Sequence, residues 1–155
     1  NSQSDLIEVD QIDGYSMILD KKQFNKDFFD EKIFMYLEND DLCLRIKKNN
    51  KKIFIFKNSF ISHLGAKAVD KKYFNELEFS RNWHWNWSKF YFKKKHHGFT
   101  KAFFSGFPIF IRSIFKSFYF LIINNKIKSK LYYCRASGFI NAALNKKSWF
   151  RPRLD

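Results

Sequence analysis

The sequence predicts an α/β fold at the N-terminus, followed by a mainly helical, aromatic-rich C-terminal region. Acidic residues are concentrated at the start: residues 1–45 hold 11 of the 15 Asp and Glu but only 5 of the 29 Lys and Arg, a net charge of −6. The other 110 residues hold 4 acids and 24 bases, a net charge of +20. Strand-like runs precede residue 63 and long apolar helical patterns follow it. We therefore expect two regions, residues 1–68 and residues 69–155.

Strand and turn signals fill the first region. Three segments have the apolar, β-prone character of short strands: residues 12–19, 53–56 and 59–62. The first contains Gly14, where another backbone can approach closely. Asp20 is expected to cap a short helix over residues 21–26. An irregular aromatic loop is expected over residues 28–34.

The segment Glu38–Lys48 predicts a helix. Its acids lie in the first turn and its bases in the last, an arrangement that the helix dipole favours. Asp41 and Arg45 are four residues apart and can pair on its surface. Asn49 and Asn50 are expected to end the helix.

The second region predicts three long helices. Asp70 is expected to cap a helix that runs to about Lys95. Thr100 is expected to cap the next, over residues 101–123, and a third is expected over residues 129–144. No run of 18 uncharged apolar residues occurs, so the sequence predicts no ordinary transmembrane helix.

The acidic helix and a nearby histidine are the residues best suited to chemistry. Glu38 and Asp41 project from one side of the first helical turn, where a carboxylate can act as a general base toward an acceptor hydroxyl. His63, at a strand end, can complete a divalent metal site with oxygen ligands from elsewhere. Both features also have a purely structural interpretation, since acids at a helix start are ordinary and a lone histidine is commonly structural.

The order of these motifs resembles the C-terminal half of family 2 glycosyltransferases, especially the rhamnosyltransferase-like branch. The resemblance covers about residues 9–65. The pieces that carry it are Asp13–Leu19, Phe29–Glu31, Phe34–Glu38, Asp41–Arg45 and Ile61–His63. A weaker resemblance continues through Arg81 and Asn82 to Lys93–Gly98.

The resemblance implies a partial GT-A-like (Rossmann-like) sheet and transfer of a sugar from a nucleotide-sugar donor to an acceptor hydroxyl, with inversion. In that family the acidic helix supplies the base, and the histidine after the last strand can help to hold the divalent cation, Mg²⁺ or Mn²⁺, on the donor diphosphate. The residues implied are Asp41, Glu38 or Asp40 as the base, with Asp41 favoured, His63 at the metal, and Gly14, Asp13, Tyr36 and Arg45 on the acceptor side.

Two departures from the family pattern affect this assignment. Many relatives have Glu-Asp where this chain has Glu38-Asn39, and an amide cannot act as a carboxylate base. The family's nucleotide-binding N-terminal half, with its Asp-x-Asp metal motif, is absent. The chain therefore resembles an acceptor-side half, and we expect it to be inactive alone.

The second region combines aromatic rings with positive charge. Trp83, Trp85 and Trp87 spread over about 200° of a helix surface, which fits either several packed neighbours or a lipid interface. Residues 101–123 carry a wide apolar arc with Arg112 and Lys116 in a narrow polar stripe, which favours a helix in the membrane interface over burial against a partner. We expect these three tryptophans and two cations to contact the membrane.

The predicted partners are a nucleotide-sugar donor, a lipid-linked or polysaccharide hydroxyl acceptor and an anionic membrane surface, and a homo-oligomer is possible. The predicted location is peripheral, at the cytoplasmic face of the cell membrane. Two alternatives stay open: a non-catalytic membrane-associated interaction module and a nucleic-acid-binding module. The second is disfavoured because the acidic helix repels phosphate and no aromatic RNA-binding signature is present.

Overall fold

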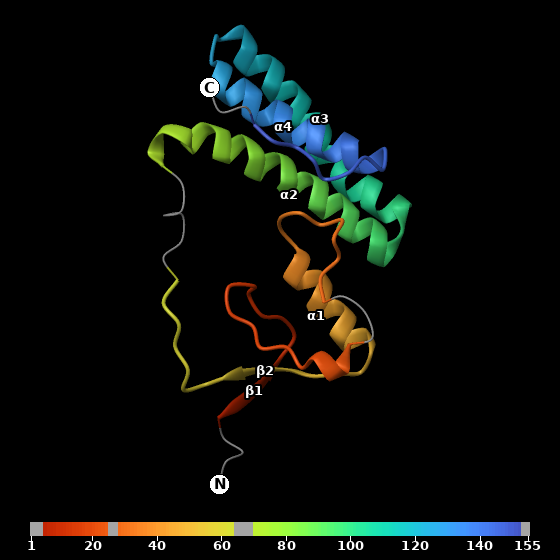
Figure 1. The fold of residues 1–155 in the computed structure, drawn as a ribbon. Helices are drawn as coiled ribbons and strands as arrows, with labels where there is room; N and C mark the ends of the chain where they lie inside the picture. The colour runs from red at the N-terminus through yellow and green to blue at the C-terminus, as the bar shows by residue number, and fades with distance from the viewer. Residues whose placement is uncertain (1–4, 25–27, 64–69, 153–155) are drawn as a thin grey trace. The chain divides into compact units, whose positions relative to one another are not determined.

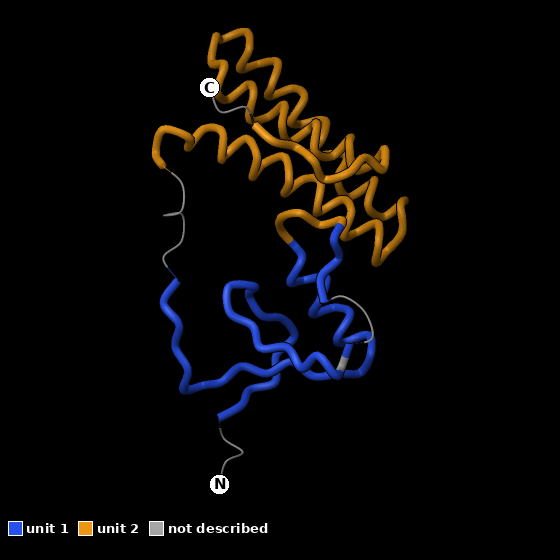
Figure 2. The backbone as a smooth tube through the Cα atoms, viewed as in Figure 1, with its two compact units in different colours: residues 1–31, 37–66 blue, residues 32–36, 67–155 orange. Residues whose placement is uncertain are grey.

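The chain forms two compact units (Figures 1 and 2). The computed structural model describes residues 5–24, 28–63 and 70–152. One unit comprises residues 1–31 and 37–66, and the other residues 32–36 and 67–155. Within the described residues the fold is mixed α/β and mostly helical, with a two-stranded sheet and four α-helices. This agrees with the predicted fold class at that level.

The first unit contains the sheet. β1 (Leu6–Val9) pairs antiparallel with β2 (Ile53–Phe56), and Leu6 lies opposite Phe56. Lys52 Nζ donates to Glu8 Oε2 over 2.8 Å beside the ladder. Ile53 is buried, but other apolar side chains on both faces of this ribbon are exposed, Phe54 and Ile55 among them. A two-stranded ribbon is only marginally stable alone.

Two of the predicted strand segments are wrong. Residues 12–19 form a loop with a turn at Gly14 and Tyr15, because Asp, Gly and Ser in this stretch favour turns over a ladder. Residues 59–62 follow a turn and pair with no strand among the described residues. The edge of β2 is taken instead by β1, whose apolar run is interrupted by Glu8.

The acidic helix forms where the sequence predicts it. α1 spans Glu38–Lys48, and Asn49 closes it by donating its backbone N–H to carbonyls of the last turn. Asn50 has the left-handed φ of 55° that asparagine tolerates at a helix end. Asp20 also caps as predicted, because its side chain accepts from Lys22 N over 3.0 Å at the short 3₁₀ helix η1 (Lys21–Gln23).

The second unit is a three-helix arrangement. After the 3₁₀ turn η2 (Lys71–Tyr73), capped by Asp70 as expected, the helices are α2 (Phe74–His97), α3 (Phe99–Ile122) and α4 (Lys126–Ala143). Figure 1 shows the three helices side by side. Gly98 separates α2 from α3 with a φ of 88°, so Gly98 begins α3 and the predicted cap, Thr100, lies inside the helix.

The core of this unit lies between α2 and α4. Trp83, Trp87 and Phe90 from α2 pack with Cys134 and Phe139 from α4, and all are nearly fully buried. A Cβ added at Gly138 would lie 2.2 Å from the backbone oxygen of Trp83. The absence of a side chain at Gly138 therefore allows α2 and α4 to pack this closely.

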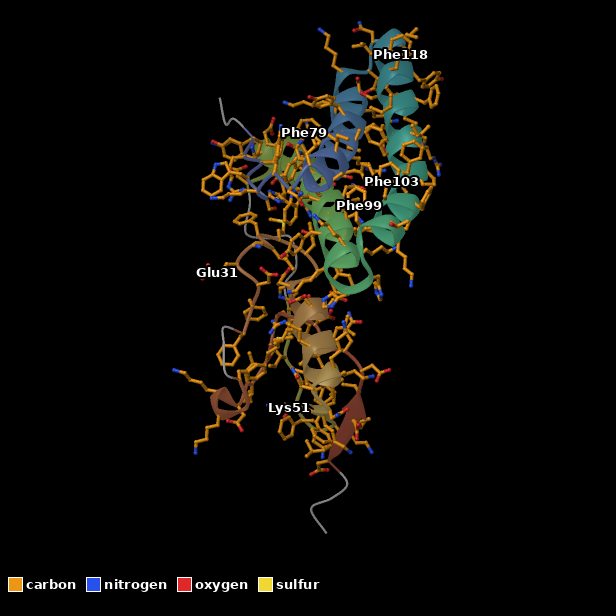
Figure 3. All side chains as sticks on the ribbon, turned by 90° about the vertical axis from the view of Figure 1, so that its right-hand side faces the viewer. Glu31, Lys51, Phe79, Phe99, Phe103 and Phe118 are labelled. Atoms are coloured by element: carbon orange, nitrogen blue, oxygen red, sulfur yellow. The ribbon has the colours of Figure 1, made fainter. Side chains whose placement is uncertain are left out.

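Most of α3 faces outward. Its most apolar 18-residue window has a mean hydropathy of 1.2 and is 6% buried, and α3 is the one helix in the described residues that is long and apolar enough to cross a membrane. The sequence analysis missed this because Arg112 and Lys116 interrupt the apolar run. Its most exposed large apolar side chains, between 58% and 70% exposed, are Phe104, Phe115, Phe118, Leu121 and Ile122. Figure 3 shows side chains projecting along this helix from Phe99 toward Phe118.

Candidate functional site

The acids of α1 stand at an unusual helix start. Leu37, the residue before the helix, has a left-handed φ of 67°, a conformation that is strained for a leucine. Its side chain offers no cap, so the first turn depends on acids, Glu38, Asp40 and Asp41, to balance the helix dipole. Backbone strain held at one place is a feature of functional sites.

The start of α1 is fastened to the loop that follows β1. Asn39 Nδ2 donates to the carbonyl oxygen of Ile12 over 3.0 Å, and Gln11 Nε2 donates to Asp40 Oδ1 over 2.5 Å. A Cβ added at Gly14 would lie 3.5 Å from Asn39 Cβ, so the loop passes directly over the helix start. The structure thus brings together Asp13, Gly14 and Asp40, three residues that the sequence analysis assigned to one site.

The same loop lines an open hollow of about 590 Å³. Asp13, Tyr15 and Ser16 contribute polar atoms, and Phe54 and Phe56 of β2 contribute apolar surface. Gln11 also lines the hollow, and its amide is the group that holds Asp40. A mixed lining of hydroxyls, a carboxylate and aromatic rings suits a hydroxyl-bearing ligand.

The pKa of Asp40 is shifted by its surroundings. Burial raises the pKa of its carboxyl from the ordinary value of an aspartate, and the charge of Asp13 adds to the rise, whereas a backbone hydrogen bond and the hydrogen bond from Gln11 oppose it. A carboxylate with a raised pKa is a better proton acceptor near neutral pH. Asp40 also stays partly accessible, unlike its neighbour Asp41.

Asp41 is a structural residue in this arrangement. Its side chain is completely buried, and Oδ2 accepts from Arg45 Nε over 2.9 Å, as the i,i+4 spacing predicts. Arg45 Nη2 also donates to the carbonyl oxygen of Phe28. The donors of Arg45 therefore fix α1 to the aromatic loop, which corrects the expectation that Arg45 contacts an acceptor. Burial of Asp41, the base that the sequence favoured, keeps its carboxylate out of reach of a substrate.

In the described residues, one buried side-chain oxygen or nitrogen atom has no hydrogen-bond partner. This atom is Oε2 of Glu38. An unpaired buried carboxylate oxygen is costly, and a water, an ion or a ligand group can supply its partner. Glu38 therefore remains a second acid of the site.

The histidine and metal assignments find little support from the surrounding residues. His63 is exposed and stacks on Tyr15, with ring centroids 5.2 Å apart and planes 8° apart. No group of three or more His, Cys, Asp or Glu in the described part of the chain is arranged to hold a metal ion. These residues do not make a complete site for Mg²⁺ or Mn²⁺, so no step below passes through a metal.

Several other predicted residues belong to the helical unit. Tyr36 accepts a hydrogen bond from Arg81 Nε over 2.9 Å and meets the Trp85 ring edge-on. Trp83 and Trp87 are buried, and their indole N–H groups donate to Ser137 Oγ and to the Lys146 carbonyl. The predicted membrane contact of these two tryptophans is therefore wrong, because residues four apart share the α2 face that α4 covers.

Trp85 lies two residues from Trp83 and from Trp87, so it is on a different face of α2, and it is 43% exposed. Arg112 is exposed as predicted for a membrane contact, whereas Lys116 lies over the Tyr132 ring of α4 and donates to its hydroxyl over 3.3 Å. Of the five residues predicted to contact lipid, Trp85 and Arg112 keep an open surface.

Comparison with known proteins adds no relative: no protein-family model matches the chain, and neither a curated protein nor a solved structure is significantly similar to it.

Two residues of the site were not foreseen. Gln11 and Asn39 hold the loop against α1 through side-chain amides, and neither amide has a distinctive spacing. The sequence offers one signal for this attachment, the amide of Asn39 in the middle of an acidic turn. From the sequence, Asn39 was interpreted only as the loss of a carboxylate. Its role as a donor explains why an amide stands there, since an aspartate could not donate to the Ile12 carbonyl.

Proposed function

We propose that the chain is the acceptor-side portion of a family 2-like inverting glycosyltransferase that works at the cytoplasmic face of a membrane. The observation that carries the proposal is the attachment of the α1 acids to the Gly14 loop beside the hollow. A base, an acceptor surface and room for a sugar-sized ligand then lie within one unit.

In this proposal Asp40 is the general base. Its carboxylate takes the proton from the acceptor hydroxyl as the oxygen attacks the anomeric carbon of the donor sugar, and the nucleoside diphosphate leaves. The polar lining of the hollow from Asp13 to Ser16 positions the acceptor. Asp41 and Arg45 position the helix and make no contact with the substrate.

The donor side is expected to come from elsewhere. Both faces of the ribbon formed by β1 and β2 expose apolar side chains, which suits packing against a nucleotide-binding half. A divalent cation, if the reaction uses one, takes its ligands mainly from that half.

The test is sugar transfer by the full-length gene product from a panel of nucleotide sugars. Asp40→Asn should lower the rate roughly a hundredfold or more, the typical contribution of a general base. Asp10→Asn is the matched control, since Asp10 is an exposed acid of the same unit that pairs with Lys47. Equal rates in the two variants, with unchanged circular dichroism, would remove Asp40 from the reaction.

The acid limb of the pH–rate profile gives a second readout. The base must be deprotonated, so the rate should fall as pH drops through the raised pKa of Asp40. Asp13→Asn removes a charge that raises this pKa and should move the limb to lower pH. An unmoved limb in Asp13→Asn would assign the titration to another group.

A non-catalytic membrane-associated module is the second candidate, favoured by the exposed apolar length of α3. Binding of the chain to vesicles, with no transfer by the full gene product for any donor, would favour it.

A further inference from the structure

A small hollow between the helices of the second unit has the chemistry of an anion site. Its volume is about 110 Å³, roughly that of four waters, which is room for one phosphate-sized group. Asn86, Lys89 and Lys93 of α2 line it on one side, and Ser105 and Gly106 of α3 line it on the other. The floor is apolar and includes the buried ring of Phe139.

Gly106 lets the Phe139 ring pack directly against α3 at the wall of the hollow. A Cβ at Gly106 would lie 2.4 Å from Phe139 Cε2, so the ring fits against α3 only with glycine there. Ser105, the preceding residue, contributes the one hydroxyl of the lining. The two helices therefore stay close while a polar opening remains between them.

Among the described residues the two lysines of the hollow have no anionic partner, and Lys89 Nζ lies 5.5 Å from the centroid of the exposed Trp85 ring. No carboxylate pairs with Lys89 or Lys93 among the described residues, whereas Lys94 is engaged by Asn145 Oδ1. The sequence contains no Asp or Glu from Phe79 to Leu154, so this whole stretch has no internal acid to offer. Burial lowers the pKa of Lys89 and the neighbouring charge of Lys93 lowers it further, which an anion between them would reverse.

The apolar residues beside the hollow indicate which kind of anion fits it. Ile109 lines it and is itself 41% exposed, and it belongs to the outward apolar surface of α3, where Phe104 is 69% exposed. A ligand that satisfies both the lysines and this surface has an anionic head and an apolar tail.

We propose that the hollow between α2 and α3 binds the phosphate headgroup of a membrane lipid, with Lys89 and Lys93 on the phosphate oxygens and the lipid chains along α3. The inference goes beyond sugar transfer: it requires membrane contact but neither Asp40 nor a nucleotide sugar, so the two proposals fail in separate assays.

The test is flotation of the 155-residue chain with phosphatidylcholine vesicles that contain or lack phosphatidate. Lys89→Gln with Lys93→Gln should weaken binding to phosphatidate vesicles about tenfold, the usual effect of losing charge-assisted hydrogen bonds. The matched control is Lys101→Gln with Lys147→Gln, two exposed lysines of the same unit outside the hollow, and it removes the same charge. Equal losses in the two double variants would overturn the site in favour of diffuse attraction.

A charge-neutral variant separates the hollow from general electrostatics. Ser105 is exposed, so Ser105→Leu should fill the opening without unfolding the unit, which circular dichroism checks. It should lose phosphatidate binding to the same extent as the lysine variant although its net charge is unchanged. Unaltered binding by Ser105→Leu would overturn the proposal.

Lysine acetylation read by mass spectrometry identifies the source of the phosphate. Phosphatidate vesicles should protect Lys89 and Lys93 from acetylation more than Lys101, and inorganic phosphate at the same phosphate concentration should not. Equal protection by inorganic phosphate would overturn the lipid assignment, and no protection by either would overturn the anion site.

Discussion

At the scale of single residues, His84 is a buried polar group of the helical unit with a partner on each ring nitrogen. It is fully buried, Nε2 lies 3.0 Å from the carbonyl oxygen of Phe150, and Nδ1 lies 2.9 Å from Ser148 Oγ. The carbonyl can only accept, so Nε2 carries the proton and Nδ1 accepts from the serine hydroxyl. This neutral tautomer ties the segment after α4 to α2.

Protonation of His84 should therefore destabilise the unit. Burial lowers the pKa of His84 and the charge of Arg151 lowers it further, while the contact with the Phe150 carbonyl opposes the shift. The unfolded chain then binds the proton more tightly than the folded chain, so stability is complete above about pH 6.5 and falls as pH drops below it. Urea unfolding at a series of pH values from about 7.5 to about 5 measures this change in the free energy of unfolding.

His84→Gln is the control for this effect, because an amide can still donate to one partner and accept from the other but does not titrate. The variant should lose most of the pH dependence in this interval. A slope that persists unchanged in His84→Gln would show that other groups cause it.

The base assignment also belongs to the residue scale, and the sequence could not decide it. Glu38, Asp40 and Asp41 all lie in one helical turn, so spacing treats them alike. Asp41 turns inward because Arg45 holds it, and Asp40 faces the loop because Gln11 reaches it from 29 residues away. Contacts between distant segments, which no local pattern records, separate their roles.

At the scale of elements, local signals predicted helices well and strands poorly. α1 begins and ends as expected because its acids, its bases and its terminal asparagines all act within one turn. The strand expected at residues 12–19 failed because pairing requires a partner from elsewhere in the chain, and β1 is the segment that pairs with β2. Burial of Trp83 and Trp87 likewise depends on α4, which lies about fifty residues further along.

The closest helix contact supplies the prediction at this scale. Gly138→Ala would place a Cβ against the Trp83 backbone, which cannot move aside as a side chain can. Overpacking of this kind typically costs about 2 kcal/mol or more in the free energy of unfolding. Chemical denaturation compares it with Tyr133→Ala, a substitution at a 62% exposed position on α4. If both variants had the same midpoint, α2 and α4 would not pack through Gly138.

At the scale of the whole molecule, charge is divided between the two units. The first has 9 Lys and Arg against 11 Asp and Glu, a net charge of −2, and the second has 20 against 4, a net charge of +16. A nearly neutral unit that holds the candidate chemistry is thus joined to a strongly basic one with an exposed apolar helix. This distribution favours contact of the second unit with an anionic surface.

Salt should therefore weaken binding to anionic vesicles in a graded way. The Debye length falls from about 10 Å at 0.1 M salt to about 3 Å at 1 M, so the electrostatic part of the attraction should be largely lost over that range. Flotation with phosphatidylglycerol vesicles across a salt series measures it. The binding that remains at high salt measures the apolar contribution to the attraction. Phe115→Ser combined with Phe118→Ser should reduce this remaining binding, since both rings are exposed. Retention that does not change with salt would contradict an electrostatic role for the basic unit.

The junction at Gly98 has a mechanical consequence for this contact. One residue ends α2 and begins α3, so the chain has no slack between the two helices. Ala102 of α3 also lies in the core that α2 and α4 share, so movement of α3 into a bilayer would disturb that core. In the proposed membrane contact, the depth of α3 would therefore determine how far Lys89 and Lys93 lie from the bilayer surface.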